Sequence, residues 1–394
     1  MKNRKFIICF LFILSAFAFV QTGKAASGAG VFVFDNSKAE FFEISFVEKN
    51  GVIMVPFRKI FENFGADVTW NEKTKTSRAS KKILNATVKT GEKKAVVNGS
   101  EIIFSVPAEI LKNTMYVPLD LIKKVPGLVV SKDDKNRIKI WEAETFIKRH
   151  GWTKLSGGLI AHAGGGLYKY ENGDKIPQIY TNSREALVSA YNNGHRVFEI
   201  DFLLTEDEKL AAIHDWSQVN GKKSSDELKK IKMYDMYKIL FLEDIYKFML
   251  EYPDTFLVTD TKSFYYSDKR KTLQFELLVN TARNMDESLL LRIVPQIYDQ
   301  NCYRLLMKTY PFESVVYTLY ESPDSDDEVV NFVAGYSNIK VVTMMWQQYS
   351  DKFYNDLTRL SKYIYFFTIN VSKETEKFRS WGVKGFYTDY INPK

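Results

Sequence analysis

The chain has 394 residues, of which 45% are hydrophobic and 26% are charged, so it is long enough for two or three domains with ordinary cores. This composition excludes a disordered or low-complexity chain. The formal net charge is +7, and four basic residues lie within the first 25 positions, whose removal leaves +3. A surplus of that size does not indicate a nucleic-acid-binding protein.

The first 25 residues have the pattern of a secretory signal peptide. Basic residues precede an apolar run over residues 6–20, and small residues follow at Ala25 and Ala26. The apolar run of about 15 residues is shorter than the ~20 that span a bilayer, so we expect cleavage, with a retained anchor as the alternative. Since Cys9 lies inside the run, cleavage leaves Cys302 as the only cysteine and excludes an intramolecular disulfide.

Residues 30–144 contain a pattern that occurs twice. The stretch GVIMVPFRKIFENFGADVTWNEKTKTSRAS begins at Gly51, and NTMYVPLDLIKKVPGLVVSKDDKNRIKIW begins at Asn113. Both run from an apolar Val-Pro segment through a helical pattern to a polar turn and a strand pattern. The sequence therefore predicts a duplicated α+β unit of strand, short helix and strand.

This region resembles the copper amine oxidase N-terminal-like domain, also called a stalk domain. The resemblance rests on Val55-Pro56-Phe57-Arg58, Phe64-Gly65-Ala66, Trp70-Asn71, Val97-Asn98-Gly99 and Tyr116-Val117-Pro118-Leu119. Copper prefers imidazole or sulfur ligands, but no histidine precedes His150 and no cysteine lies between Cys9 and Cys302. We therefore expect a non-catalytic spacer that associates with the cell wall or envelope.

Residues 150–394 alternate between apolar strand patterns and helical patterns. We expect strands at 158–162, 197–202, 255–262, 291–298, 315–320, 340–346, 363–370 and 385–389, with an extra strand at 209–214. Helices are expected at 184–192, 242–250, 269–284, 301–309, 326–334, 351–360 and 372–381. Parallel strands that alternate with helices predict an α/β fold, and eight repeats predict a closed (β/α)8 TIM barrel.

Acidic side chains lie near the ends of the predicted barrel strands, where the active site of such a barrel forms. Glu199 and Asp201 are two residues apart and so lie on one face of a strand, and Asp260 ends the next strand. Burying adjacent carboxylates is costly unless a cation neutralises them, and oxygen ligands suit Ca²⁺ or Mg²⁺. The alternative is a strand whose charged face lies in water, which is rare in a parallel barrel.

Two histidines also end strands, and we expect them to serve as a general acid and a general base. His162 ends the first strand before a glycine turn at residues 164–166, and His214 ends the extra strand. The alternative for either one alone is a local hydrogen bond. His150 lies in a predicted linker and His195 in a turn before a strand, so neither is a candidate.

The segments LIAHAGG, TNSREALVSAYNNGHRVFEIDFLLTEDEKLAAIHDW, LVTDTK and GVKGFYTDYIN occur in this order and together resemble the glycerophosphodiester phosphodiesterase family, relatives of phosphatidylinositol-specific phospholipase C. The resemblance implies a metal-dependent phosphodiesterase on a TIM barrel. It implies His162 and His214 as the acid/base pair, with Glu199 and Asp201 as metal ligands. Asp260 stands where the family usually has a glutamate ligand.

Further positions bear on substrate binding. Lys262 matches a lysine near the phosphate and Asn182 an asparagine of the family pattern, although Thr181 replaces the usual glutamate before it. The family usually has an arginine after the first histidine, where a guanidinium grips two phosphate oxygens, but this chain has Ala163. The cations that we consider as substitutes are Lys262, Arg196 and Lys169.

The predicted function is that of a secreted or cell-envelope phosphodiesterase that hydrolyses glycerophosphodiester-type bonds to a phosphomonoester and an alcohol. Attack by water and attack by a neighbouring substrate hydroxyl remain open, and the resemblance favours the latter. One alternative is a catalytically inactive ligand-binding protein. Another is a phosphodiesterase for phosphatidylinositol, teichoic acid or a phosphoglycan, whose sugar or glycerol units would stack on loop aromatics. The aromatic candidates are Tyr168, Tyr170, Trp216 and Tyr265.

Overall fold

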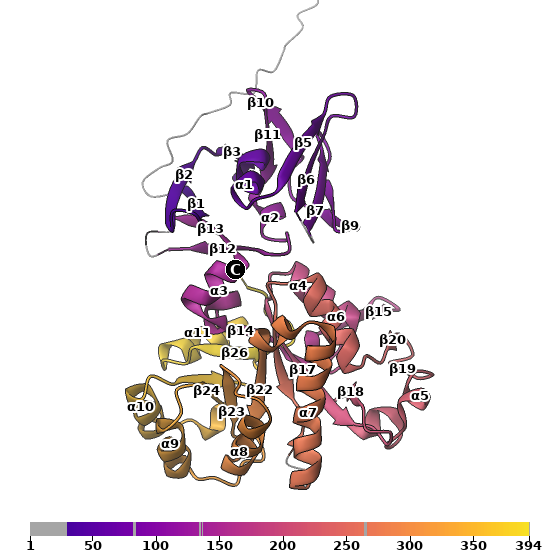
Figure 1. Cartoon of the computed structure of the whole chain (residues 1–394), viewed down its shortest axis with the longest axis vertical. Coiled ribbons are helices and arrows are strands. Elements are labelled where there is room, and N and C mark those ends of the chain that lie inside the picture. The colour runs from indigo at the N-terminus through magenta and orange to yellow at the C-terminus, as the bar shows by residue number, and fades with distance from the viewer. Residues whose placement is uncertain (1–29, 82–83, 134, 136, 264–265, 394) are drawn as a thin grey trace, which may run out of the picture.

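The computed structural model describes residues 30–81, 84–133, 135, 137–263 and 266–393, so the predicted signal peptide and Tyr265 lie outside the described residues. Figure 1 shows an N-terminal part rich in strands, coloured indigo to magenta, stacked on one end of a barrel that runs from pink to yellow. None of the helices in the described part of the chain is long and apolar enough to cross a membrane.

The N-terminal part contains three small sheets. One sheet has the order β12 (Leu128–Lys132), β13 (Ile138–Glu142), β1 (Val31–Asp35) and β2 (Glu40–Ile44). A second has the order β10 (Glu109–Leu111), β11 (Thr114–Pro118), β4 (Val52–Pro56) and β3 (Val47–Lys49). The third is an antiparallel meander of β5 (Asp67–Asn71), β6 (Thr76–Lys81), β7 (Leu84–Lys89), β8 (Lys94–Val97) and β9 (Ser100–Ile103). The helices α1 (Phe57–Asn63) and α2 (Leu119–Ile122) each follow a Val-Pro strand end.

The two similar stretches of sequence have the same order of elements. The first is β4, α1 and the hairpin β5–β6, and the second is β11, α2 and the hairpin β12–β13. The two Val-Pro strands pair antiparallel, with Val117 opposite Val55. The expected order of strand, helix and strand is therefore present, while descent from a duplication stays a prediction.

The C-terminal part is a closed barrel of eight parallel strands, as the sequence predicts. The strands are β14 (Leu159–Ala161), β17 (Val197–Leu204), β21 (Phe256–Asp260), β22 (Ile293–Ile297), β23 (Val315–Thr318), β24 (Ile339–Met344), β25 (Tyr363–Phe366) and β26 (Gly385–Thr388). The barrel closes because β14 pairs with both β26 and β17. The predicted extra strand is β18 (Leu210–Ala212), which lies antiparallel to β17.

Helices lie outside the barrel between its strands (Figure 1). They are α4 (Arg184–Asn192), α5 (Ser225–Leu228), α6 (Leu242–Glu251), α7 (Asp268–Met285), α8 (Gln300–Thr309), α9 (Asp326–Ala334), α10 (Asp351–Arg359) and α11 (Ser372–Ser380). Serine caps fix two starts: Ser183 accepts from the backbone N–H of Ala186, and Ser325 forms a capping box with Glu328. Two small hairpins, β15–β16 (Leu167–Glu171 and Asp174–Gln178) and β19–β20 (Lys232–Met233 and Tyr237–Lys238), complete this part.

The N-terminal part covers the end of the barrel where the strands begin. The predicted linker around His150 is instead helix α3 (Ala143–His150), whose Phe146 packs on Trp141. These two side chains share a buried cluster with Trp152 and with interior barrel residues such as Val258 and Val316. Because a continuous apolar cluster joins the two parts, the N-terminal part closes the bottom of the barrel.

Candidate active site

The candidate site forms at the opposite end of the barrel, where the strands finish. His162 follows β14, Asp260 ends β21, and Asp389 follows β26. Asp201 of β17 lies opposite Asp260 in the parallel register. Strand order alone therefore brings together side chains that are far apart in the sequence.

Three buried carboxylates form the centre of the site, as the sequence predicts. One oxygen from each of Glu199, Asp201 and Asp260 lies within 4.8 Å of the others. Burial and the negative charge of Asp201 raise the pKa of Glu199 to about 8. Burial also raises the pKa of Asp201, but the positive charge of Lys262 outweighs it and the pKa falls to about 2.

Lys262 lies among these carboxylates. Its Nζ is 2.9 Å from Oδ1 of Asp201 and also pairs with Asp260, which accepts a further hydrogen bond from the Tyr298 hydroxyl. Burial lowers the pKa of Lys262, yet the surrounding carboxylates raise it well above its ordinary value. The donor atoms are all carboxylate oxygens, and the Glu199 carboxyl, which is protonated at neutral pH, has to ionise before it binds a cation. These residues fit a hard divalent cation such as Mg²⁺ or Ca²⁺.

His162 is held by an acidic partner that the sequence does not assign. Its Nδ1 lies 2.9 Å from Oδ1 of Asp389, whose other oxygen accepts a 2.6 Å hydrogen bond from Asn370. Burial lowers the pKa of His162, but the hydrogen bond to Asp389 and the nearby carboxylates outweigh burial and raise it to about 9. His162 is therefore a charged imidazolium at neutral pH, with Nε2 as its available donor.

His214 follows β18, and one tyrosine ring contacts both histidines. The Tyr180 ring centroid is 4.9 Å from that of His162 and 4.2 Å from that of His214. Burial lowers the pKa of His214, so this imidazole is neutral when His162 is charged. Tyr180 was not predicted from the sequence, because its position depends on a loop turn with φ of +55°.

Asn182 and the backbone of Ala163 form hydrogen bonds with two of the carboxylate residues. The Asn182 amide donates to Asp201 at 3.0 Å and accepts from the backbone N–H of Asp201 at 3.1 Å. The backbone N–H of Ala163 donates to Glu199 at 2.8 Å. Gly164 and Gly165 then turn the chain with φ values of +80° and +106°, which glycine adopts readily. The structure thus gives Asn182 a hydrogen bond to a candidate metal ligand.

Arg196 does not lie at the site, which corrects the prediction that it contacts substrate. It precedes the first residue of β17, at the end of the barrel covered by the N-terminal part, and donates to the backbone carbonyl of Lys123 at 2.5 Å. Its guanidinium also forms a buried 2.6 Å ion pair with Asp254. Lys169 pairs with Glu171 on the exposed hairpin β15–β16. Of the three cations considered in place of arginine, Lys262 is the one within the carboxylate cluster.

A cavity of about 210 Å³ opens beside His214 and Lys262. Its other lining residues are Leu203, Asp215, Trp216, Tyr266 and Tyr320. Of the predicted aromatic contacts, Trp216 lines this cavity, while Tyr168 stacks on Tyr390 at 4.6 Å. Lys262 therefore lies both in the lining of this cavity and in ion pairs with two of the buried carboxylates.

Comparisons with known proteins found one matching family model and a set of similar solved structures. The family model of the copper amine oxidase N-terminal domain matches residues 33–140. A search of curated proteins found no match. Similar solved structures include a putative glycerophosphoryl diester phosphodiesterase from Silicibacter pomeroyi, with 15% identity, a TM-score of 0.48, and coverage of 60% of this chain and 91% of that one.

Two further structures are similar over the same part of the chain. A glycerophosphodiester phosphodiesterase from Parabacteroides distasonis has 21% identity and a TM-score of 0.47, and covers 60% of this chain and 94% of its own. A phosphodiesterase from Oleispira antarctica, in complex with the product sn-glycerol-3-phosphate, has 17% identity and a TM-score of 0.48, and covers 63% and 95%. The assignment of the barrel itself rests on the strand pairing of this chain.

Proposed function

We propose that the barrel is a phosphodiesterase that depends on a divalent cation and hydrolyses glycerophosphodiester-type bonds to a phosphomonoester and an alcohol. The observation that carries the proposal is the meeting of two histidines, which contact the same Tyr180 ring, with three buried carboxylates at the finishing end of the barrel. The pKa of His162 is raised to about 9, whereas that of His214 is lowered. Two titratable groups whose environments separate their pKa values are suited to the roles of acid and base.

The charge states assign the two roles. Neutral His214 accepts the proton of the attacking hydroxyl, and charged His162 donates its Nε2 proton to the leaving alkoxide. Asp389 keeps the proton-bearing Nδ1 of His162 in place. Glu199, Asp201 and Asp260 would hold the cation, which supplies charge neutralisation at a phosphate oxygen. Lys262 adds its positive charge at the same place.

The proposal also includes the classes of phosphodiester that the barrel would accept. Ala163 is fully buried and offers no guanidinium to a phosphate, so we infer that Lys262 takes the anion-binding role. Glycerophosphodiesters, phosphatidylinositol and teichoic acid or phosphoglycan fragments all present a hydroxyl near the phosphorus. Export by residues 1–25 and wall association through the N-terminal part belong to the same proposal, because they would bring the enzyme to envelope polymers.

The test is an assay of the chain without residues 1–25 against these diesters, with Mg²⁺ or Ca²⁺. Phosphorus NMR detects the phosphomonoester and any cyclic phosphate on the route to it. We expect His162→Ala and His214→Ala to abolish turnover and His195→Asn, the matched control outside the site, to retain it. Binding of a diester without release of alcohol would favour the inactive ligand-binding protein, for which the absent arginine at Ala163 is the supporting observation.

A further inference from the structure

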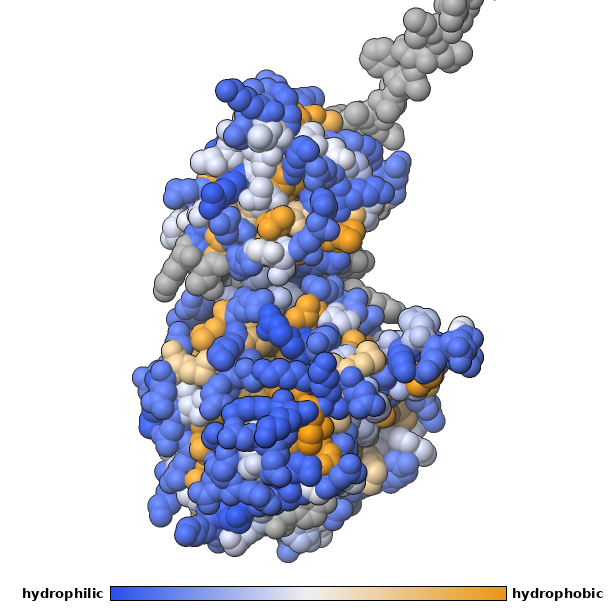
Figure 2. All heavy atoms as spheres, turned by 90° about the vertical axis from the view of Figure 1, so that its right-hand side faces the viewer, coloured by the Kyte–Doolittle hydropathy of each residue, from blue (hydrophilic) through white to orange (hydrophobic). Residues whose placement is uncertain are grey.

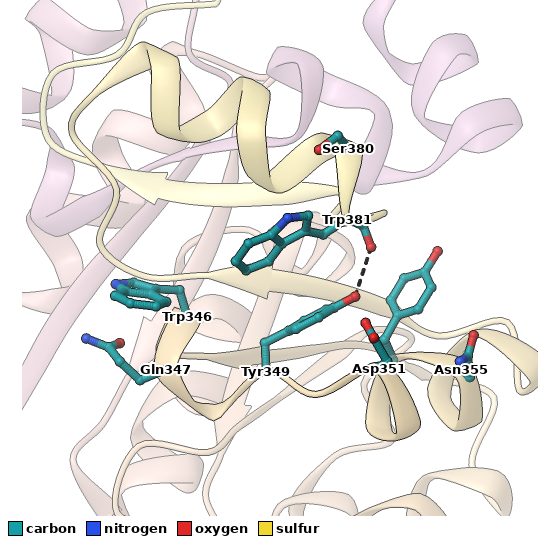
Figure 3. A pocket seen from close by; sticks show the side chains of 8 residues that line it. Trp346, Gln347, Tyr349, Asp351, Asn355, Ser380 and Trp381 are labelled. Atoms are coloured by element: carbon teal, nitrogen blue, oxygen red, sulfur yellow. Dashed lines mark hydrogen bonds between the residues drawn. The ribbon is translucent and has the colours of Figure 1, made fainter.

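A second hollow lies on the outside of the barrel, away from the carboxylates. It has a volume of about 640 Å³ and lies between the turn η6 (Trp346–Gln348), α10 and the end of α11 (Figure 3). Its lining residues are Trp346, Gln347, Tyr349, Asp351, Tyr354, Asn355, Ser380 and Trp381. We call this hollow the aromatic groove. It is built almost entirely from aromatic rings and from side chains that form hydrogen bonds.

The rings of the aromatic groove are fixed by packing. Trp381 lies over Tyr349 at a centroid distance of 5.3 Å, and the Tyr349 hydroxyl donates to the backbone carbonyl of Trp381 at 3.0 Å (Figure 3). Phe378 packs on Trp381 at 5.0 Å and lies roughly parallel to Trp346 at 6.2 Å. Trp346 is nevertheless 44% exposed. A tryptophan that is both fixed and exposed offers a flat face to a ligand.

Polar groups lie at both ends of these rings. Gln347 is next to Trp346 at one end, and Asp351 and Asn355 of α10 are at the other (Figure 3). The ammonium of Lys377 is 5.0 Å from the Trp381 ring and 6.0 Å from the Trp346 ring, and it forms no ion pair within the described residues. The groove therefore combines apolar faces with groups that bind hydroxyls, and it carries positive charge at its tryptophans.

We propose that the aromatic groove binds a saccharide chain that carries anionic substituents. A pyranose ring presents a C–H face, which packs on an indole, and equatorial hydroxyls, which both donate and accept hydrogen bonds. At one end of the groove Asp351 accepts from hydroxyls and Asn355 accepts or donates, and at the other end Gln347 accepts or donates while Lys377 matches an anionic substituent.

Two other ligand classes fit the groove less well. A quaternary ammonium would be repelled by Lys377, which already occupies the cation position over the rings. A proline-rich peptide also stacks on aromatic grooves, but it offers mainly carbonyl acceptors, which the Asp351 carboxylate cannot bind. The saccharide is therefore the occupant that satisfies both the rings and the polar ends.

The proposal is independent of the phosphodiesterase activity, because the groove shares no residue with the carboxylate site. Trp346 follows the finishing end of β24, on the same face of the barrel as the candidate active site. The Trp346 end of a bound polymer would therefore lie toward the face on which the pocket opens, whereas Ser380 and Trp381 end α11, which leads back to the start of β26.

Binding is tested with two oligosaccharides of equal length: the neutral β-1,4-linked N-acetylglucosamine hexamer and an acidic hyaluronan hexamer. Isothermal titration calorimetry on the purified protein measures affinity, and tryptophan fluorescence reports contact with the rings. We expect the acidic hexamer to bind more tightly, with salt reducing the difference. Trp346→Ala should weaken binding of both hexamers by about tenfold or more.

Further variants separate binding from folding. Lys377→Gln should remove the preference for the acidic hexamer, and Asn355→Ala should weaken both without affecting the rings. Trp70→Ala, which removes a partly exposed tryptophan from the N-terminal part, is the matched control and should leave affinity unchanged. The proposal is overturned if neither hexamer binds more tightly than about 1 mM. Unchanged affinity in Trp346→Ala, or binding of a polyproline peptide in place of the hexamers, would overturn it as well.

Discussion

Replacing Asp389 by asparagine tests how the site charges His162. The difference between a pKa of about 9 and the ordinary 6.5 corresponds to about 3 kcal/mol of preference for the imidazolium. The side chain of His162 is only 12% exposed, so solvent screens this preference little. Asparagine keeps the shape of the residue but removes its charge, and we expect the His162 pKa to fall by about 1–2.

Histidine NMR titration is the direct measurement, because the chain contains four histidines and His162→Ala identifies the signal. His195 is an internal control for the fold, since burial lowers its pKa to about 4. A His162 signal that titrates at the same pH in Asp389→Asn and in the unsubstituted protein would refute this account of the site.

The same substitution has a consequence for stability. Because the folded-state pKa of His162 is raised, its contribution to the free energy of unfolding is full below pH 6.5 and is lost as the pH rises to about 9. Chemical denaturation at a series of pH values should therefore show a smaller loss of stability over that range in Asp389→Asn.

Three further predictions concern other parts of the barrel. Arg196→Met should lower the free energy of unfolding by about 3–5 kcal/mol in urea denaturation, because it leaves the buried carboxylate of Asp254 unpaired, with kcat/KM of the folded enzyme retained. Tyr180→Ala should reduce kcat about tenfold, because the Tyr180 ring positions both histidines through contacts of ~0.5–1.5 kcal/mol each. Tyr180→Phe keeps the ring and should retain kcat. An equal loss of kcat in both variants would contradict a role for the ring. Mg²⁺ binding at pH 7 should release close to one proton, because the Glu199 carboxyl, with a pKa of about 8, must ionise to bind metal. Calorimetry in two buffers of different ionisation enthalpy measures this release, and Glu199→Gln should abolish it.

The barrel and its carboxylates were predictable from the sequence because both depend on local pattern. Apolar runs of strand length alternate with helical periodicity, and Ser183 and Ser325 mark the starts of α4 and α9. The spacing of Glu199 and Asp201 fixes a shared strand face, and the structure brings Asp260 beside them. Because the strands are parallel, all of them finish at the same end of the barrel, and the residues at those strand ends come together there.

The remaining features depend on closure of the fold. His162 meets Asp389 across 227 residues, a contact made only when β26 pairs with β14. Tyr180 reaches both histidines from a loop turn that no periodicity indicates. Arg196 could have been excluded from the sequence alone. It stands before β17, and the starts of the parallel strands lie at the end of the barrel opposite the site.

The covered end of the barrel also sets a direction for the whole molecule. The N-terminal part is attached where the strands begin, and the pocket opens where they finish. A partner that binds the N-terminal part away from this junction would therefore lie behind the barrel and leave its mouth open. A long polymer could then reach the pocket without passing that partner.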